Sequence, residues 1–187
     1  AVDVARLAAA GTDTIIAGSM SNHPPAITKT HAGVKLDFTS KFTDRQNSSD
    51  DGNNGESTSC CSPTEAGHWP APSIELANYR EQARALADAG CDLIFLEMVK
   101  DRTHGDLLVK AAVEVGLPVV IGLTMELAEC GRARARDDKD LFLDELVRRW
   151  GHHENVVGFG AMHCNAYDVA TFVEQIRALV GTEAFVP

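Results

Sequence analysis

The sequence predicts an α/β fold, a parallel β/α barrel of the TIM type with about four to five βα units present. Amphipathic helical segments alternate with short, nearly unbroken apolar runs, which are typical of strands buried on both faces of a parallel sheet. This βα unit recurs four times, and such alternation specifies parallel strands joined by right-handed crossovers. A doubly wound sheet would show the same pattern, but no Gly-x-Gly-x-x-Gly follows any apolar run, so the barrel is favoured.

The clearest unit is an amphipathic helix that ends at Gly90 and a buried strand that follows it over 91–96. Ser73 is predicted to cap the helix, with Ile74 and Leu76 on its inner face. The helix, the glycine and the apolar run together make one αβ step.

The other elements repeat this pattern in order, each helix ending near a glycine or a polar turn. Helices are predicted over 1–10, 103–115, 141–150 and 168–180, and strands over 14–17, 118–123 and 155–162. The charged segment 129–139 is predicted to be a loop.

A single domain over 1–187 is predicted, with an irregular insertion or loop at about 38–72. No periodicity is visible from 23 to 72. Within it, 44–64 is rich in Ser, Asn, Asp and Gly and cannot bury enough apolar surface to offset the entropy of ordering. We expect a mobile surface loop there.

Charge and composition exclude several classes of function. A net charge of −10 and a pI near 5.1 argue against binding to nucleic acid or to anionic membranes, which need a basic surface. No apolar run approaches the ~20 residues of a membrane span, and no signal peptide opens the chain. The five cysteines, an odd number, fit reduced thiols, so we expect a cytoplasmic protein. Because the chain opens at Ala1 without an initiator methionine, we expect a segment of a longer domain.

Candidate site residues follow directly after the predicted strands. In parallel α/β folds the carboxyl ends of the strands meet at one edge, where chemistry collects. Glu97 and Thr124 lie at two such ends. Ser19 lies among small residues that either let backbone approach a ligand or simply form a tight turn, the second being favoured. Cys164 could be a nucleophile, a zinc ligand or a small apolar filler.

The remaining histidines and cysteines are weaker candidates. His163 neighbours Cys164, and adjacent strand residues point to opposite faces, so both cannot enter one cavity. The others lie in loops, in the irregular segment or at the amino end of a strand, where rigid ligand geometry is not supported. These residues are His152, His153, Cys60, Cys61, Cys91 and Cys130.

Several motifs resemble those of the homocysteine S-methyltransferases. They are Ile15-Ile16-Ala17-Gly18-Ser19, Tyr79-Arg80-Glu81-Gln82 with Ala89-Gly90-Cys91-Asp92, Phe95-Leu96-Glu97-Met98, and Val157-Gly158-Phe159 through Cys164. The resemblance covers 1–21 and 73–180. It implies an eight-stranded β/α barrel that binds zinc through three cysteines and transfers a methyl group to the thiol of homocysteine, giving methionine.

The resemblance also assigns residues. Cys164 corresponds to the first zinc cysteine of a Gly-x-Asn-Cys motif, with Ala161 and His163 in place of glycine and asparagine. Glu97 corresponds to the acidic residue of a Phe-Glu-Thr motif that holds the substrate amino group. Ser19 and Thr124 are then expected to bind substrate. Zinc would lower the pKa of the homocysteine thiol and hold its sulfur for attack on an activated methyl group.

The chain departs from the family pattern at both ends. The paired zinc cysteines of a Gly-Gly-Cys-Cys motif have no counterpart before Pro187, and the first two barrel strands have none either. The resemblance therefore covers the third to the sixth strand of the barrel. No Asp-x-His-x-x-Gly motif of cobalamin proteins occurs, which favours a small donor used directly. The alternative is a catalytically inactive, truncated barrel that acts as a binding or scaffold fragment.

Overall fold

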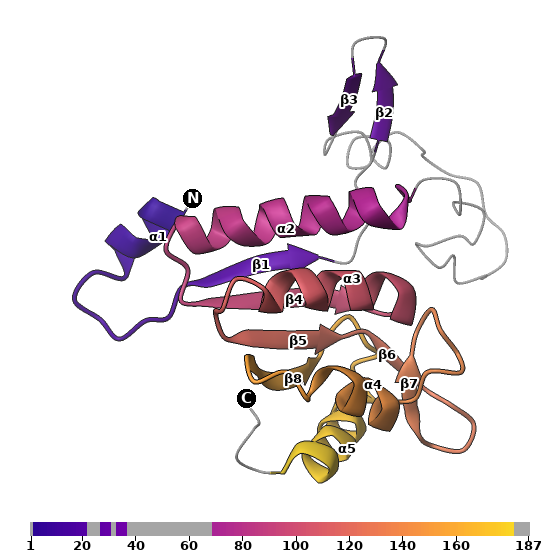
Figure 1. Cartoon of the computed structure of the whole chain (residues 1–187). Coiled ribbons are helices and arrows are strands. Elements are labelled where there is room, and N and C mark those ends of the chain that lie inside the picture. Colours follow the sequence, from indigo (N-terminus) through magenta and orange to yellow (C-terminus); the bar gives the residue numbers. More distant parts are fainter. Residues whose placement is uncertain (1, 22–26, 31–32, 37–68, 182–187) are drawn as a thin grey trace, which may run out of the picture. The chain divides into compact units, whose positions relative to one another are not determined.

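The computed structural model describes residues 2–21, 27–30, 33–36 and 69–181 (Figure 1). The chain divides into two compact units, 1–22 with 72–187 and 23–71. The larger unit is built on a four-stranded parallel sheet in the order β1-β4-β5-β8. Its strands are β1 Ala17–Ser21, β4 Leu93–Val99, β5 Val119–Leu123 and β8 Val156–Ala161. This is the mainly parallel α/β sheet that was predicted, and among the described strands it stays open.

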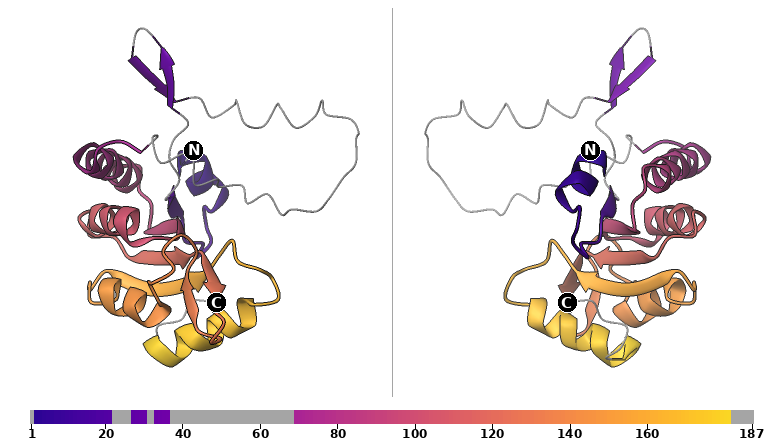
Figure 2. Two further views of the ribbon diagram at one scale, coloured as in Figure 1. Left: turned by 90° about the vertical axis from the view of Figure 1, so that its right-hand side faces the viewer. Right: turned by 90° about the vertical axis from the view of Figure 1, so that its left-hand side faces the viewer.

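Helices cover one face of this sheet. In Figure 2, α2, α3 and α4 lie side by side along it. Alternate strand residues such as Met20, Leu96 and Ile121 are buried on the helix side, whereas Ser19 and Phe95 on the other face are at least partly exposed. The described residues of this unit form helices α1 Val2–Ala8, α2 Pro72–Asp88, α3 Arg102–Val113, α4 Leu143–Trp150 and α5 Val169–Val180. No helix in the described part of the chain is long and apolar enough to cross a membrane.

The inner face of α2 differs from the predicted one. The helix begins at Pro72, a residue favoured at a first helical position, so Ser73 lies inside the helix and is not its cap. Ile74 is 55% exposed, whereas Glu75 is only 3% exposed and is buried on the same face as Tyr79. The prediction was wrong for Ile74, whereas Leu76 packs against the core as predicted. Contacts with α3 and the sheet, and not hydropathy alone, choose which face of this helix is buried.

Strand β1 also lies further along the chain than predicted. The strand was expected over 14–17, with a turn after it, but Ala17–Ser21 are the paired residues. The carboxylate of Asp92 accepts a hydrogen bond from Ile16 N at 2.7 Å, and Asp92 N donates to Ile16 O at 2.8 Å. These two bonds set the register, so pairing with β4 begins only at Ala17.

Most of 129–139 is a loop, as predicted, but a short strand interrupts it. Strand β7 Ala133–Ala135 lies within this range and forms an antiparallel ribbon with β6 Met125–Leu127, which precedes it. Charged side chains stabilise the ribbon, because the Glu126 carboxylate lies 2.7 Å from Arg134 and 2.5 Å from Lys139. Burial opposes ionisation of Glu126, but these two cations outweigh it and hold its pKa below the usual value.

The smaller unit contains an antiparallel hairpin of β2 Ile27–Thr30 and β3 Gly33–Leu36. The absence of periodicity over 23–72 did not predict these strands, because each is too short for alternation to be visible. The irregular segment 44–64, and most of the predicted insertion at 38–72, lies outside the described residues.

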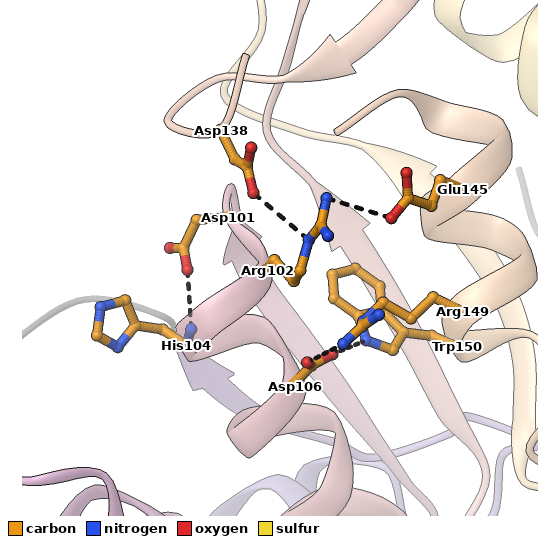
Figure 3. A network of polar contacts seen from close by, with 8 residues as sticks. All are labelled: Asp101, Arg102, His104, Asp106, Asp138, Glu145, Arg149 and Trp150. Atoms are coloured by element: carbon orange, nitrogen blue, oxygen red, sulfur yellow. Dashed lines mark hydrogen bonds and ion pairs between the residues drawn. The ribbon is translucent and has the colours of Figure 1, made fainter. Parts of the chain in front are cut away.

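Helices α3 and α4 are joined by a polar network (Figure 3). Asp106 accepts hydrogen bonds from Arg149 Nε at 2.6 Å and from the Trp150 indole at 2.9 Å. Burial opposes ionisation of Asp106, but these donors hold its pKa below the usual value. At the start of α3, Arg102 lies 3.2 Å from Glu145, so charge pairs connect both ends of the contact.

The helix contact depends on the absence of a side chain at Gly105. A Cβ added there would lie 2.7 Å from Trp150 and 3.1 Å from Val99, which is too close for atoms of a packed core. Because Trp150 is only 2% exposed, the indole cannot swing into solvent without opening the core.

We predict that Gly105→Ala destabilises the protein, although alanine favours a helix by about 1 kcal/mol. Overpacking against Trp150 should cost about 1–3 kcal/mol and exceed that gain. Urea unfolding followed by tryptophan fluorescence measures the change. Lys110→Ala, at an exposed position of α3, is the control and should change stability by less than about 0.5 kcal/mol. A higher midpoint for Gly105→Ala than for the natural protein would contradict this account.

Candidate functional site

The four predicted site residues lie along the carboxyl edge of the parallel sheet. Ser21 is paired with Glu97, Val99 with Leu123, and Leu123 with Ala161, so the ends of neighbouring strands are level. This edge is where β/α barrels bind their ligands. They fall into two pairs: Ser19 and Glu97, which are hydrogen-bonded, and Thr124 and Cys164, where the Cys164 sulfur contacts the backbone of Met125, the residue after Thr124.

The first pair lies beside a bulge in β4. The strand continues to Val99, so Glu97 lies within it and not after it as predicted. The pairing with β5 shifts between Leu96 and Val99, and Met98 adopts the left-handed conformation with φ 59°. Strand alternation places Glu97 on the face opposite Leu96, away from the helices, where Ser19 Oγ donates a hydrogen bond to its Oε1 at 2.7 Å. The extra residue then returns Val99 to the buried helix side.

Met162 connects the bulge to the strand beyond β5. Its backbone N–H donates to Leu123 O at 2.9 Å, and its sulfur accepts a hydrogen bond from Met98 N at 3.2 Å. The side chain crosses Gly122, where an added Cβ would lie 2.7 Å from the sulfur and 2.9 Å from Leu96 O. Gly122 therefore lets Met162 reach the strained Met98 backbone and stabilise it.

The second pair lies at the ends of β5 and β8. Thr124 is 1% exposed, and its hydroxyl has no hydrogen-bond partner among the described residues. Next to it, Cys164 Sγ accepts a hydrogen bond from Met125 N at 3.3 Å and lies 3.1 Å from Met162 O. Burial raises the pKa of the Cys164 thiol, although the Met125 N–H and the nearby Arg136 charge oppose the shift.

Arg136 is a member of this edge that the sequence did not reveal. Its backbone N–H donates to Thr124 O at 3.1 Å, and its guanidinium donates to His163 O at 3.3 Å. His163 itself is exposed and left-handed, with φ 49°, while Cys164 after it is half-buried. The only signal in the sequence was the basic character of 132–136, which reads as a solvated loop.

Other candidate ligands do not converge on this edge. Cys91 is buried, Cys130 is exposed, and the stacked rings of His152 and His153 precede β8, at the amino end of the sheet. The remaining two cysteines, Cys60 and Cys61, lie outside the described residues. In the described part of the chain, no group of three or more His, Cys, Asp or Glu side chains could hold a metal ion. Cys164 therefore does not belong to a three-ligand site within the described residues.

A buried polar cluster between α2 and α3 was also missed. His104 Nδ1 lies 2.9 Å and 3.0 Å from the two carboxylate oxygens of Glu75. The hydroxyl of Tyr79 contacts the same Glu75 carboxylate. Burial, together with this carboxylate, raises the pKa of Tyr79. Polar residues on a helix usually indicate a solvated face, so hydropathy alone could not find this cluster.

The fold is a parallel α/β sheet with candidate site residues along its carboxyl edge, which is consistent with part of a TIM-type barrel. The family model for homocysteine S-methyltransferase matches residues 1–185, and the chain belongs to that family. Among solved structures it is similar to the apo form of the homocysteine methyltransferase MmuM from Escherichia coli, with a TM-score of 0.58 and 16% sequence identity.

That similarity concerns the fold. The alignment covers 95% of this chain and 49% of MmuM, so this chain spans about half the length of that structure. A comparison with curated protein sequences gave no significant match. The family model, which covers nearly the whole chain, confirms the predicted resemblance to the homocysteine S-methyltransferases.

We predict that Met162→Leu loosens the bulge in β4. Leucine keeps most of the volume but cannot accept the hydrogen bond from Met98 N, so the strained backbone loses its partner. Hydrogen exchange of the Met98 amide should become several-fold faster. The control is Met125→Leu. It replaces another buried methionine, whereas the bond from Met98 N goes to Met162. Unchanged exchange at Met98 in Met162→Leu would show that the sulfur does not hold the bulge.

Proposed function

We propose that the protein transfers a methyl group from a small activated donor to the thiol of homocysteine, giving methionine. Membership of the homocysteine S-methyltransferase family supports the reaction class. The single structural observation that carries the proposal is the hydrogen bond from Ser19 to Glu97 at the carboxyl edge of the sheet. It supports the proposal because the carboxyl edge is where barrel enzymes bind substrates.

Glu97 is proposed to bind the ammonium group of homocysteine. Ser19 donates to Oε1 and so orients the carboxylate, while Oε2 has no partner among the described side chains. A carboxylate that accepts from an ammonium group makes a charge-assisted hydrogen bond, about twice as strong as a neutral one. Thr124 is proposed as a further substrate contact, because its buried hydroxyl has a free hydrogen-bonding capacity within the described structure.

The reaction itself is a displacement at carbon. The homocysteine sulfur attacks the methyl group, the new S–C bond forms as the bond to the donor breaks, and the donor leaves with the electron pair. The residues of the edge would hold the acceptor and exclude competing orientations, which is the contribution of positioning to such a step. We further propose a cytoplasmic setting, because the described cysteines are all unpaired thiols.

Zinc is part of this proposal only through Cys164. The described residues by themselves do not fit a zinc site, since one half-buried thiol is present where three protein ligands are normally needed. The other ligands would have to come from outside the described residues. The raised pKa of the Cys164 thiol is consistent with a neutral side chain when no metal is near.

We predict that Glu97→Gln weakens homocysteine binding by about ten- to a hundredfold, because the amide loses the charge that attracts the ammonium group. Isothermal titration of homocysteine into the purified chain measures the dissociation constant. Glu81→Gln, an exposed residue of α2, is the matched control and should bind like the natural protein. Equal affinity of Glu97→Gln and the natural protein would remove Glu97 from the site.

We predict that the purified chain holds zinc at well below one equivalent after dialysis. Metal affinity is built from several deprotonated ligands acting together, and Cys164 alone cannot supply it. Atomic absorption measures the content, with Cys164→Ser and Cys130→Ser as the test and control variants. Stoichiometric zinc that survives dialysis would contradict this expectation and point to Cys60 and Cys61 as further ligands.

A further inference from the structure

We propose that Arg136 binds the carboxylate of the amino-acid substrate, at the opposite end of the site from Glu97. This assignment rests on the proposed function, because it takes the acceptor to be an amino acid that bears a thiol. Arg136 becomes a specificity-determining residue that selects for an acceptor with a free α-carboxylate.

The Arg136 backbone is held rigidly at the edge. The residue directly follows β7, its N–H donates to Thr124 O at 3.1 Å, and its guanidinium donates to His163 O at 3.3 Å. These bonds connect Arg136 to the ends of both β5 and β8. A side chain anchored in this way loses less entropy when a ligand binds.

The guanidinium retains capacity for an anion. It carries five N–H donors, and the bond to His163 uses one. The acidic residues that follow it along the ribbon are engaged elsewhere, because Asp137 lies 2.7 Å from Lys100 and Asp138 lies 3.7 Å from Arg102. No ion pair of Arg136 itself occurs within the described structure. An exposed arginine of this kind matches the planar geometry of a carboxylate.

The buried hydroxyl of Thr124 is an independent sign of a ligand at this position. Thr124 is 1% exposed and its Oγ1 has no partner among the described residues. Leaving a buried hydroxyl unpaired costs about 1–3 kcal/mol, so such groups are usually satisfied by a ligand or water. Its own carbonyl accepts from Arg136, so the unpaired hydroxyl and the guanidinium belong to one short stretch of the edge.

The spacing of the two charged residues suits a zwitterion. Glu97 lies on β4 and Arg136 lies between the ends of β5 and β8. Neighbouring strands are about 4.8 Å apart, so the one to two strand spacings from β4 to this position span about 5–10 Å. An α-amino acid with a hydrogen bond of about 2.8 Å at its ammonium and another at its carboxylate spans roughly 8–9 Å. The side chain of the bound amino acid could then extend toward Cys164.

Competing alkylation of Cys164 tests the anion site in the protein as it exists. Iodoacetate and iodoacetamide attack the same thiolate, form an S–C bond and release iodide, but only iodoacetate carries a carboxylate. The ratio of their rates does not depend on the fraction of thiolate. Mass spectrometry of the Cys164 peptide, referenced to exposed Cys130, measures that ratio in each variant.

In Arg136→Gln the iodoacetate preference at Cys164 should fall by about two- to fivefold, the range expected for one exposed charge pair. Arg136→Lys should keep part of the preference, because the charge remains while the paired donors are lost. Arg84→Gln, an exposed arginine on α2, should leave the ratio unchanged. An unchanged ratio in Arg136→Gln, or an equal fall in Arg84→Gln, would overturn the assignment.

Three ligands separate this inference from the proposed function. Homocysteine carries both charges, 4-mercaptobutanoate lacks the ammonium group, and 3-aminopropane-1-thiol lacks the carboxylate. Titration calorimetry should show that Arg136→Gln weakens the binding of homocysteine and 4-mercaptobutanoate about tenfold and leaves the binding of 3-aminopropane-1-thiol unchanged. Glu97→Gln should weaken the binding of 3-aminopropane-1-thiol and leave that of 4-mercaptobutanoate unchanged.

Different results of these titrations contradict either the Arg136 assignment or the proposed function. If Glu97→Gln weakens homocysteine and Arg136→Gln does not, the Arg136 assignment is wrong and the proposed function remains. If the natural protein binds no homocysteine, the proposed function fails for this chain. The carboxylate assignment fails with it unless 4-mercaptobutanoate binds and depends on Arg136.

Discussion

The pairing of β5 on both sides is the constraint on which the rest of the larger unit depends. All five residues of Val119–Leu123 are buried, so no position on this strand can carry a solvated polar side chain. It aligns β4 on one side and β8 on the other, and the helices cover the resulting apolar face. Because the strands are parallel, the same pairing brings their carboxyl ends to one edge. The position of every candidate site residue follows from that alignment.

At this edge, contacts of the backbone position the side chains of the candidate site. Met98 departs from the β4 ladder in a left-handed bulge, and the Met162 sulfur stabilises it across Gly122. The carbonyl of Thr124 holds the backbone of Arg136. Side chains attached to such a rigid frame keep their orientation without a ligand, which lowers the cost of binding. Opposite charges on Glu97 and Arg136 then distinguish the two ends of the edge.

Strand and helix positions were predictable where hydrophobic periodicity was strong. The runs over 91–96, 118–123 and 155–162 correspond to β4, β5 and β8, because strands of a parallel sheet form short apolar runs, although only β5 is buried along its whole length. Periodicity failed where hydrogen bonds or charges decide the structure. Asp92 sets the start of β1, and Glu126 pairs with cations across a ribbon that reads as a charged loop. Neither interaction has a signature in local hydropathy.

The sequence by itself determined the parallel βα architecture, the family, and the candidates Ser19, Glu97, Thr124 and Cys164, since these depend on local pattern and motif. Only the tertiary structure decided which of them touch. Residues far apart in the chain, such as Ser19 and Glu97, meet through strand register. Arg136 reaches the same edge through two hydrogen bonds to distant carbonyls. Such contacts join residues remote in sequence, and no local pattern of residue types encodes their geometry.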